Sequence, residues 1–210
     1  MPENTNIILV CGGSCSGKTT LATALVDAMR SFGSVEIISM DNYYFDLNHM
    51  DPVVADNKNF DSPEAVNSEL LFQHLKDLQA HKKVREQRYD FKSHCVTELD
   101  TYIKTTDFII LEGIFALYFE KLRNLAAAKI FVHADADIRL ARRVERDISM
   151  RHLPVDMVIR QYLKDVRPMH AEYIEPYSKY ADLILNSNFT TQLENQRKAL
   201  KFLEGHLINV

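Results

Sequence analysis

The chain has 210 residues, 46% of them hydrophobic, which predicts one globular domain, residues 1–210, with a substantial core. Its net charge of −4 argues against nucleic acid or an anionic membrane as the main partner. No apolar run approaches the ~20 residues of a membrane span, and the first residues lack a signal-peptide pattern. Three cysteines without metal-ligand spacing are typical of a reducing compartment, so we expect a cytoplasmic protein.

Strand-like apolar runs alternate with helical patterns along most of the chain. This alternation predicts an α/β fold, with a mainly parallel sheet covered by helices on both faces. In chain order, the predicted elements are a strand at 6–11, a helix at 18–32, a strand at 35–40, a helix at 64–80, strands at 107–111 and 129–133, a helix at 136–150, a helical region at 154–173 kinked by Pro168, a strand at 182–186 and a helix at 191–207.

Two segments interrupt this alternation. Residues 42–61 are polar and rich in Asp and Asn, which indicates a long loop or lid. Residues 84–90 and 96–102 form two short polar runs joined by a turn at 92–94. These runs are too polar for central strands, so we expect a hairpin that projects from the sheet.

The stretch IILVCGGSCSGKTT contains a phosphate-binding loop. Gly12, Gly17, Lys18 and Thr19 match the pattern G-x-x-x-x-G-K-[ST], between a predicted strand and a predicted helix. The loop's backbone N–H groups and the helix N-terminus suit phosphate oxygens, Lys18 can reach the β- and γ-phosphates, and the Thr19 hydroxyl can ligate Mg²⁺. The predicted nucleotide-binding residues are Gly12, Gly13, Ser14, Cys15, Ser16, Gly17, Lys18, Thr19, Thr20 and Arg143.

Acidic residues follow three other predicted strands, at the sheet edge where parallel α/β folds bind ligands. Asp41 is a candidate general base for an attacking hydroxyl, although an Asp before Asn42 equally suits a turn cap. Glu112 follows an apolar strand, as the Mg²⁺-holding acid of such kinases does, whereas the alternative is a carboxylate facing solvent. Asp135 and Asp137 mark the third position.

Five arginines cluster in the second half of the chain. Arg139, Arg142, Arg143 and Arg146 share one helical face, and Arg151 follows it. We expect one or two of them to contact phosphate, because arginines stabilise a transferring phosphoryl group. The alternative is a solvated stripe paired with Glu145 and Asp147.

A histidine in the predicted hairpin turn raises a similar choice. His94, beside Tyr89 and Phe91, could hydrogen-bond and stack on a heterocycle. The residues alone favour a chance histidine on a surface hairpin.

Seven segments together resemble the uridine kinase (uridine-cytidine kinase) family of P-loop kinases. They are GGSCSGKTT, DNYY, NFDSPEA, RYDFKSH, LEGI, DADIRLARRVERDI and VRPMHAEYIEPYSKYAD, in the family's order from about residue 7 to 186. The resemblance implies a P-loop NTPase fold of three α/β/α layers, with a hairpin insertion at about 84–102 and a lid region at about 139–165.

The resemblance also implies an activity, the phosphorylation of the 5′-hydroxyl of uridine and cytidine by ATP or GTP with Mg²⁺. It makes Asp41 the general base, Lys18 its catalytic partner, and Thr19 and Glu112 the metal residues. It places the acceptor against Asp41, Tyr44, Phe60, Asp61, Tyr89, Phe91, His94, Ile114, Arg146, Arg151 and Gln161. A homotetramer and feedback by CTP and UTP are further implications.

Two alternatives stay open at this stage. One is a kinase with the same scaffold and another small acceptor, as in pantothenate kinase or phosphoribulokinase. The other is a nucleotide-binding switch without phosphoryl transfer. Retention of Lys18, Thr19, Asp41 and Glu112 together argues against the switch.

Overall fold

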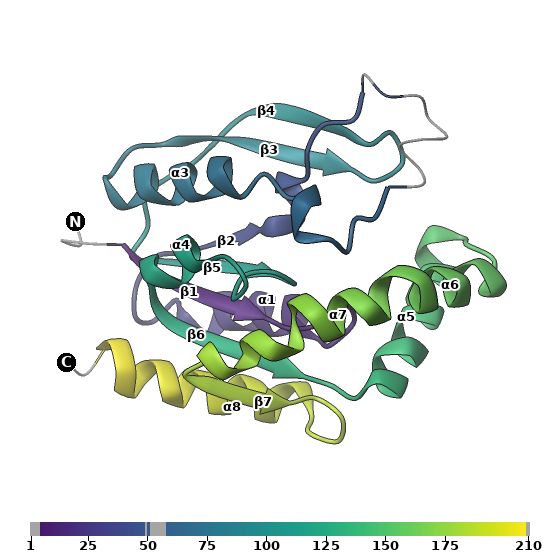
Figure 1. Cartoon of the computed structure of the whole chain (residues 1–210). Coiled ribbons are helices and arrows are strands. Elements are labelled where there is room, and N and C mark those ends of the chain that lie inside the picture. The colour runs from purple at the N-terminus through teal and green to yellow at the C-terminus, as the bar shows by residue number, and fades with distance from the viewer. Residues whose placement is uncertain (1–4, 49, 51–57, 209–210) are drawn as a thin grey trace.

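The protein is built on a five-stranded sheet (Figure 1). The computed structural model describes residues 5–48, 50 and 58–208. Every neighbouring pair in the sheet is parallel, which confirms the predicted fold class. The strands, in spatial order, are β2 (Val35–Ser39), β5 (Phe108–Gly113), β1 (Asn6–Cys11), β6 (Ala126–His133) and β7 (Leu183–Asn186).

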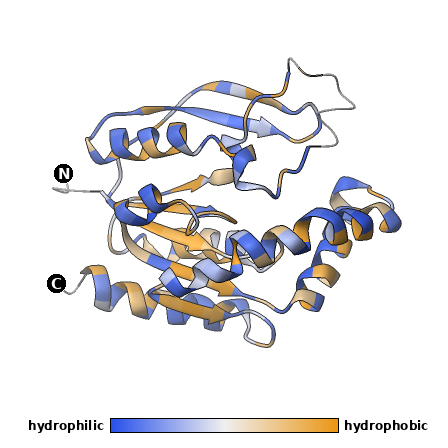
Figure 2. Ribbon diagram, viewed as in Figure 1, coloured by the Kyte–Doolittle hydropathy of each residue, from blue (hydrophilic) through white to orange (hydrophobic). Residues whose placement is uncertain are grey.

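Two hydrophobic clusters cover the two faces of this sheet. Alternate residues of β1 serve different faces: Ile8 belongs to the cluster with α1 (Lys18–Met29) and α8 (Gln192–Leu203), and Leu9 to the cluster with α3 (Ser68–Gln79). Because both faces are buried, the central strands are continuously apolar, as the colouring of Figure 2 shows.

Four further helices complete the fold in the part of the chain that the structure describes. They are α4 (Glu120–Leu125), α5 (Ala136–Arg151), α6 (Val155–Gln161) and α7 (Arg167–Tyr173). Short helical turns occur at Met40–Tyr43, Pro63–Ala65, Tyr162–Val166, Glu175–Tyr180 and Glu204–Ile208. None of the helices in the described ranges has the length and apolarity to cross a membrane.

Several element boundaries differ from the predicted ones. Helix α3 begins at Ser68 rather than 64, because the Asn67 side chain caps it by accepting from Leu70 N at 3.1 Å. The expected kink at Pro168 is a π-helical turn just before it, in which Arg167 N donates to Tyr162 O. Helix α4 was not predicted, and α1 ends at Met29, one turn early.

The predicted hairpin is present as strands β3 (Val84–Asp90) and β4 (Cys95–Ile103). It is anchored beside the segment that follows β2: Gln87 Nε2 donates to Asn42 O at 2.7 Å, and Tyr89 N donates to Asn42 Oδ1 at 3.3 Å. The predicted loop at 42–61 lies partly outside the described residues. Its described ends approach each other where Tyr44 bridges to Val66.

A close approach at the end of β5 generates the first prediction. A Cβ on Gly113 would lie 2.4 Å from Met40 Cβ, and Met40 is buried. Gly113→Ala therefore forces the chain apart beside Asp41 and should lower the free energy of unfolding by about 1–3 kcal/mol. Denaturant unfolding measures this change, with Gly205→Ala as the control because nothing lies within 4 Å of that position. Equal stability of both variants would contradict the packing argument.

Candidate active site

The phosphate-binding loop joins β1 to α1. Gly17, the N-cap of α1, has φ of 96° and provides no side-chain cap, and Ser16 N donates to Gly13 O at 3.0 Å. The first N–H groups of α1 are thus left for an external acceptor. A helix N-terminus of this kind binds an anion.

Thr19 and Glu112 lie together at the adjoining strand ends. Thr19 Oγ1 donates to Glu112 Oε2 at 3.0 Å, and Ser39 Oγ donates to Glu112 Oε1 at 2.6 Å. Glu112 is 3% exposed, so the alternative of a solvent-facing carboxylate is wrong. Hydroxyl and carboxylate oxygens suit Mg²⁺, and these two residues would hold it beside the phosphates.

Asp41 lies in the helical turn directly after β2, where its N–H donates to Ser39 Oγ at 3.4 Å. Burial raises the pKa of its carboxyl, and the charges of Glu112 and Asp61 add to the rise, whereas Lys18 and Arg151 lower it. Burial likewise raises the pKa of Asp61, against the charges of Arg143, Lys18 and Arg146. The carboxyls of Asp41 and Asp61, from distant segments of the chain, therefore both interact electrostatically with Lys18.

An aromatic cluster adjoins these two carboxyls. Phe60 stacks on His94 with ring centroids 5.0 Å apart, and Tyr89 OH lies 3.4 Å from His94 Nδ1. Tyr44 OH donates to Phe60 O at 3.0 Å, and its ring meets those of Phe60, Tyr89 and Phe91 within 5.6 Å. Burial and the charges of Asp41 and Asp61 raise the pKa of Tyr44. The cluster brings the predicted acceptor aromatics together.

Three arginines converge on one buried carboxylate, that of Asp147, which is fully inaccessible to solvent. Its ion-pair distances are 3.4 Å to Arg143 Nε, 2.8 Å to Arg146 Nε and 3.5 Å to Arg151 Nε. The expected pairing with Asp147 is present, but a fully solvated stripe is wrong, because Arg139 and Arg143 are buried.

The guanidinium groups of Arg143 and Arg151 contact different parts of the protein. Arg143 Nη1 donates to Ser14 Oγ and its Nη2 to Gln161 Oε1, both at 3.0 Å. Arg151 lies over the Phe91 ring at 5.5 Å. Helix α5 thus contacts both the phosphate loop and the hairpin.

A cavity of about 670 Å³ opens beside the loop, a size that suits a nucleotide. Sequence reasoning missed part of its lining: Arg142 Nη1 donates to Ser187 Oγ at 2.9 Å, and Asn195 lines the same cavity. The strand-end rule, applied also to β7, would have found Ser187. The residues that line the cavity are Cys15, Gly17, Lys18, Thr19, Thr20, Leu21, Val132, Arg142, Arg146, Met150, Ser187, Thr190, Gln192 and Asn195.

Most of the predicted acceptor residues do not line this cavity, and Ile114 and Asp135 lie apart from the aromatic cluster as well. Ile114 is 7% exposed within the core, and its carbonyl accepts from the Cys11 thiol at 3.2 Å. Asp135 N donates to Asn188 Oδ1 at 2.8 Å, and Asp135 is not part of the cavity lining. Contact between Ile114 and an acceptor stays a prediction.

Comparison with known proteins agrees with this geometry. The profile of the "Phosphoribulokinase / Uridine kinase family" matches residues 7–194. The uridine kinase of Brevibacillus brevis is 43% identical over 182 residues, covering 87% of this chain and 85% of that protein. The uridine kinase of Macrococcus caseolyticus is 43% identical over 183 residues, covering 87% and 88%.

A solved structure shows the same fold at lower identity. A "possible uridine kinase" from Bacillus stearothermophilus superposes with a TM-score of 0.63 at 20% identity, covering 88% of this chain and 90% of that one. The match of the family profile to nearly the whole chain, together with the phosphate loop and its strand-end carboxylates, identifies this protein as a member of the phosphoribulokinase/uridine kinase family.

Proposed function

We propose that this protein transfers the γ-phosphoryl group of ATP or GTP to the 5′-hydroxyl of uridine and cytidine. Its relatives at 43% identity are uridine kinases. The observation that carries the proposal is the position of Asp41. Its pKa responds to Lys18 of the phosphate loop on one side, and its charge raises the pKa of Tyr44 in the aromatic cluster on the other.

Asp41 acts as the general base in this proposal. A raised pKa makes a carboxylate a stronger base, because the pKa lies closer to the working pH. The carboxyl must be ionised to accept the proton of the attacking hydroxyl. Lys18 nearby lowers the pKa again and favours that ionised form.

Positive charge surrounds the transferring group. Lys18 and the outer nitrogens of Arg143 and Arg146 stabilise negative charge on the phosphoryl oxygens, because guanidinium groups match phosphate geometry. Asp147 fixes these arginines before the donor binds. Mg²⁺, held by Thr19 and Glu112, would neutralise charge on the donor's terminal phosphates.

The aromatic cluster supplies the acceptor site. Tyr89 and His94 present a hydroxyl and an imidazole that interact with each other, and each can donate or accept a hydrogen bond. Such a pair can meet either the carbonyl of uridine or the amino group of cytidine. Asp61 accepts from ribose hydroxyls. Arg151, over Phe91, and Gln161, bonded to Arg143, connect this site to the lid region. Homotetramer formation and feedback by CTP or UTP remain predictions of the family resemblance.

An acceptor panel tests the activity directly. ADP release with ATP·Mg²⁺ should occur with uridine and cytidine, and not with adenosine, pantothenate or ribulose 5-phosphate, because only the pyrimidine nucleosides suit the Tyr89–His94 pair. Turnover with another acceptor alone would replace the proposed acceptor. Nucleotide binding without turnover on any acceptor would favour a nucleotide-binding switch.

Asp41→Asn should have opposite effects on activity and stability. Loss of the base should lower kcat about a hundredfold or more, with uridine affinity retained. The raised pKa of Asp41 means that folding favours its protonated form, so the ionised carboxylate destabilises the fold above the folded-state pKa and not below the unfolded-state pKa. The variant should therefore unfold at a higher temperature than wild type at pH 7, and this difference should shrink at acid pH. Steady-state kinetics and thermal unfolding measure both effects, and near-wild-type kcat would refute the base assignment.

Glu112→Gln tests the metal pair. The amide keeps the shape of the side chain but removes the charge that faces Thr19, so the Mg²⁺ concentration for half-maximal activity should rise about tenfold or more. A magnesium titration of the ADP-release rate measures this shift. The matched control is Glu145→Gln, since Glu145 is exposed on α5 and its side chain makes none of the contacts described at the site. An unchanged magnesium requirement in Glu112→Gln would exclude this residue from the metal site.

A further inference from the structure

Arg139 is a buried cation that forms no ion pair with any of the described residues. The residue is 4% exposed, near the start of α5. Its Nε donates to Ala134 O at 3.0 Å, whereas its Nη1 is buried without a hydrogen-bond partner. Burial lowers the pKa of Arg139, and the charges of Glu175 and Asp135 oppose this lowering only in part. Among the described residues, none forms an ion pair with its guanidinium. An uncompensated buried charge is costly, so its retention needs an explanation.

The guanidinium lies against the back of the phosphate loop. A Cβ added to Gly13 would be 3.0 Å from Arg139 Nη1 and 2.8 Å from the His170 ring. A larger residue at this position would displace the His170 ring or the Arg139 guanidinium. The positive charge of Arg139 is separated from the phosphate side by little more than one backbone segment.

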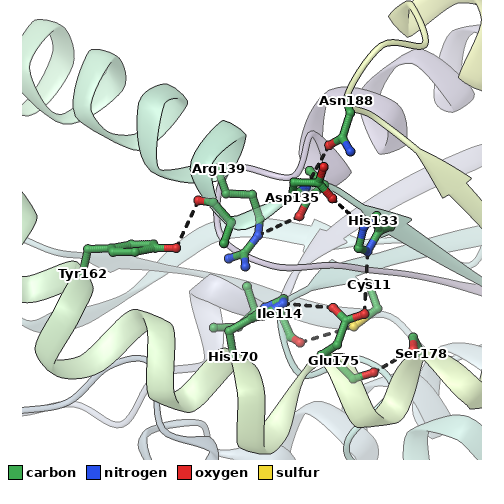
Figure 3. A network of polar contacts seen from close by, with 12 residues as sticks. Cys11, Ile114, His133, Asp135, Arg139, Tyr162, His170, Glu175, Ser178 and Asn188 are labelled. Atoms are coloured by element: carbon green, nitrogen blue, oxygen red, sulfur yellow. Dashed lines mark hydrogen bonds and ion pairs between the residues drawn. The ribbon is translucent and has the colours of Figure 1, made fainter.

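His170 lies near the guanidinium and beside the same Gly13 segment (Figure 3). Its Nε2 lies 3.0 Å from Glu175 Oε2, and its Nδ1 is buried without a partner. Burial, and then the charge of Arg139, lower the pKa of His170 to about 4. The ring is thus neutral at physiological pH, and it contributes no second cation beside Arg139.

The two carboxylates whose charges act on Arg139 also interact with histidines. Glu175 interacts with His170 and, through Oε1, lies 3.6 Å from His133 Nδ1. Asp135 Oδ1 lies 3.2 Å from His133 Nε2. By contrast, Arg143 and two further arginines of the same helical region share the carboxylate of Asp147. Arg139 therefore lacks an ion-pair partner that an external anion could supply.

We propose that Arg139 is an electrostatic positioning residue of the donor site, whose charge is compensated by the donor's phosphates through the Gly13 segment, with the His170 ring packed beside the same segment. This inference rests on the phosphate-binding part of the proposed function and not on the acceptor. The RPMH segment, which the family resemblance singled out without a role, supplies His170.

A purely structural role makes a different prediction. If Arg139 served only the fold, its replacement would lower stability and weaken all ligands together. If the charge of Arg139 serves to bind phosphate, removing that charge does not destabilise the nucleotide-free protein. It lowers the affinity for phosphate-bearing ligands only.

The experiment compares Arg139→Met, Arg139→Lys and His133→Gln with wild type. Arg139→Met removes the charge with similar volume, Arg139→Lys keeps the charge, and His133→Gln alters the same polar network without contacting the loop. Calorimetry measures ADP affinity, thermal unfolding without nucleotide measures stability, and kinetics separate the KM for ATP from the KM for uridine.

Arg139→Met should weaken ADP binding and raise the KM for ATP, each about tenfold, with an unchanged KM for uridine. This is the size of effect seen when a residue that supports the binding groups, without contacting the ligand, is removed. Its unfolding temperature without nucleotide should equal or exceed that of wild type. Arg139→Lys and His133→Gln should bind ADP within threefold of wild type.

Wild-type ADP affinity in Arg139→Met would overturn the inference. So would failure of that variant to fold, or equal loss of affinity in Arg139→Lys. A wild-type protein that binds ADP but does not phosphorylate uridine would refute the proposed acceptor while this inference is still decided by the ADP measurements.

Discussion

The carboxylate of Glu112 joins three separate parts of the sheet edge. One oxygen accepts from Thr19 at the start of α1, and the other from Ser39 at the end of β2. Because β5 lies between β1 and β2, this single buried group sets the phosphate loop and the Asp41 turn in register. The hairpin is then placed by Asn42, the next residue after Asp41.

The distribution of charge around this edge is uneven in a way that suits phosphate. Asp147 compensates three arginines and fixes their directions, whereas the charge of Arg139, behind the loop, is only partly compensated. Asp41 and Asp61 are themselves disfavoured in their ionised forms by burial. These buried charges are unfavourable in the protein without ligand, and a bound ligand can compensate them. The electrostatic cost therefore lies at the positions where ligand binding lowers it.

Much of this arrangement was predictable, for reasons that differ between elements. The inner strands β5, β1 and β6 are predictable because burial on both faces demands continuous apolar runs. Helix α4 and the start of β6 at Ala126 were not, because an alanine-rich segment has little strand preference and pairing with β1 decides its state. The start of α3 depended on Asn67, a capping side chain that propensity alone does not separate from the preceding turn.

The sequence by itself determined the phosphate loop, the strand-end acids and the order of the layers, because these depend on local backbone geometry and on burial patterns within short segments. Only the tertiary structure decided which charges meet. Arg139, Arg142, Arg143 and Arg146 lie on one helical face, yet they differ in partner. Asp147 belongs to the same helix, four residues after Arg143, whereas Ser187 and the Gly13 segment approach the helix from other parts of the chain. Helical spacing predicts the pairing of Arg143 with Asp147, whereas the contacts of Arg142 with Ser187 and of Arg139 with the Gly13 segment are set by packing alone.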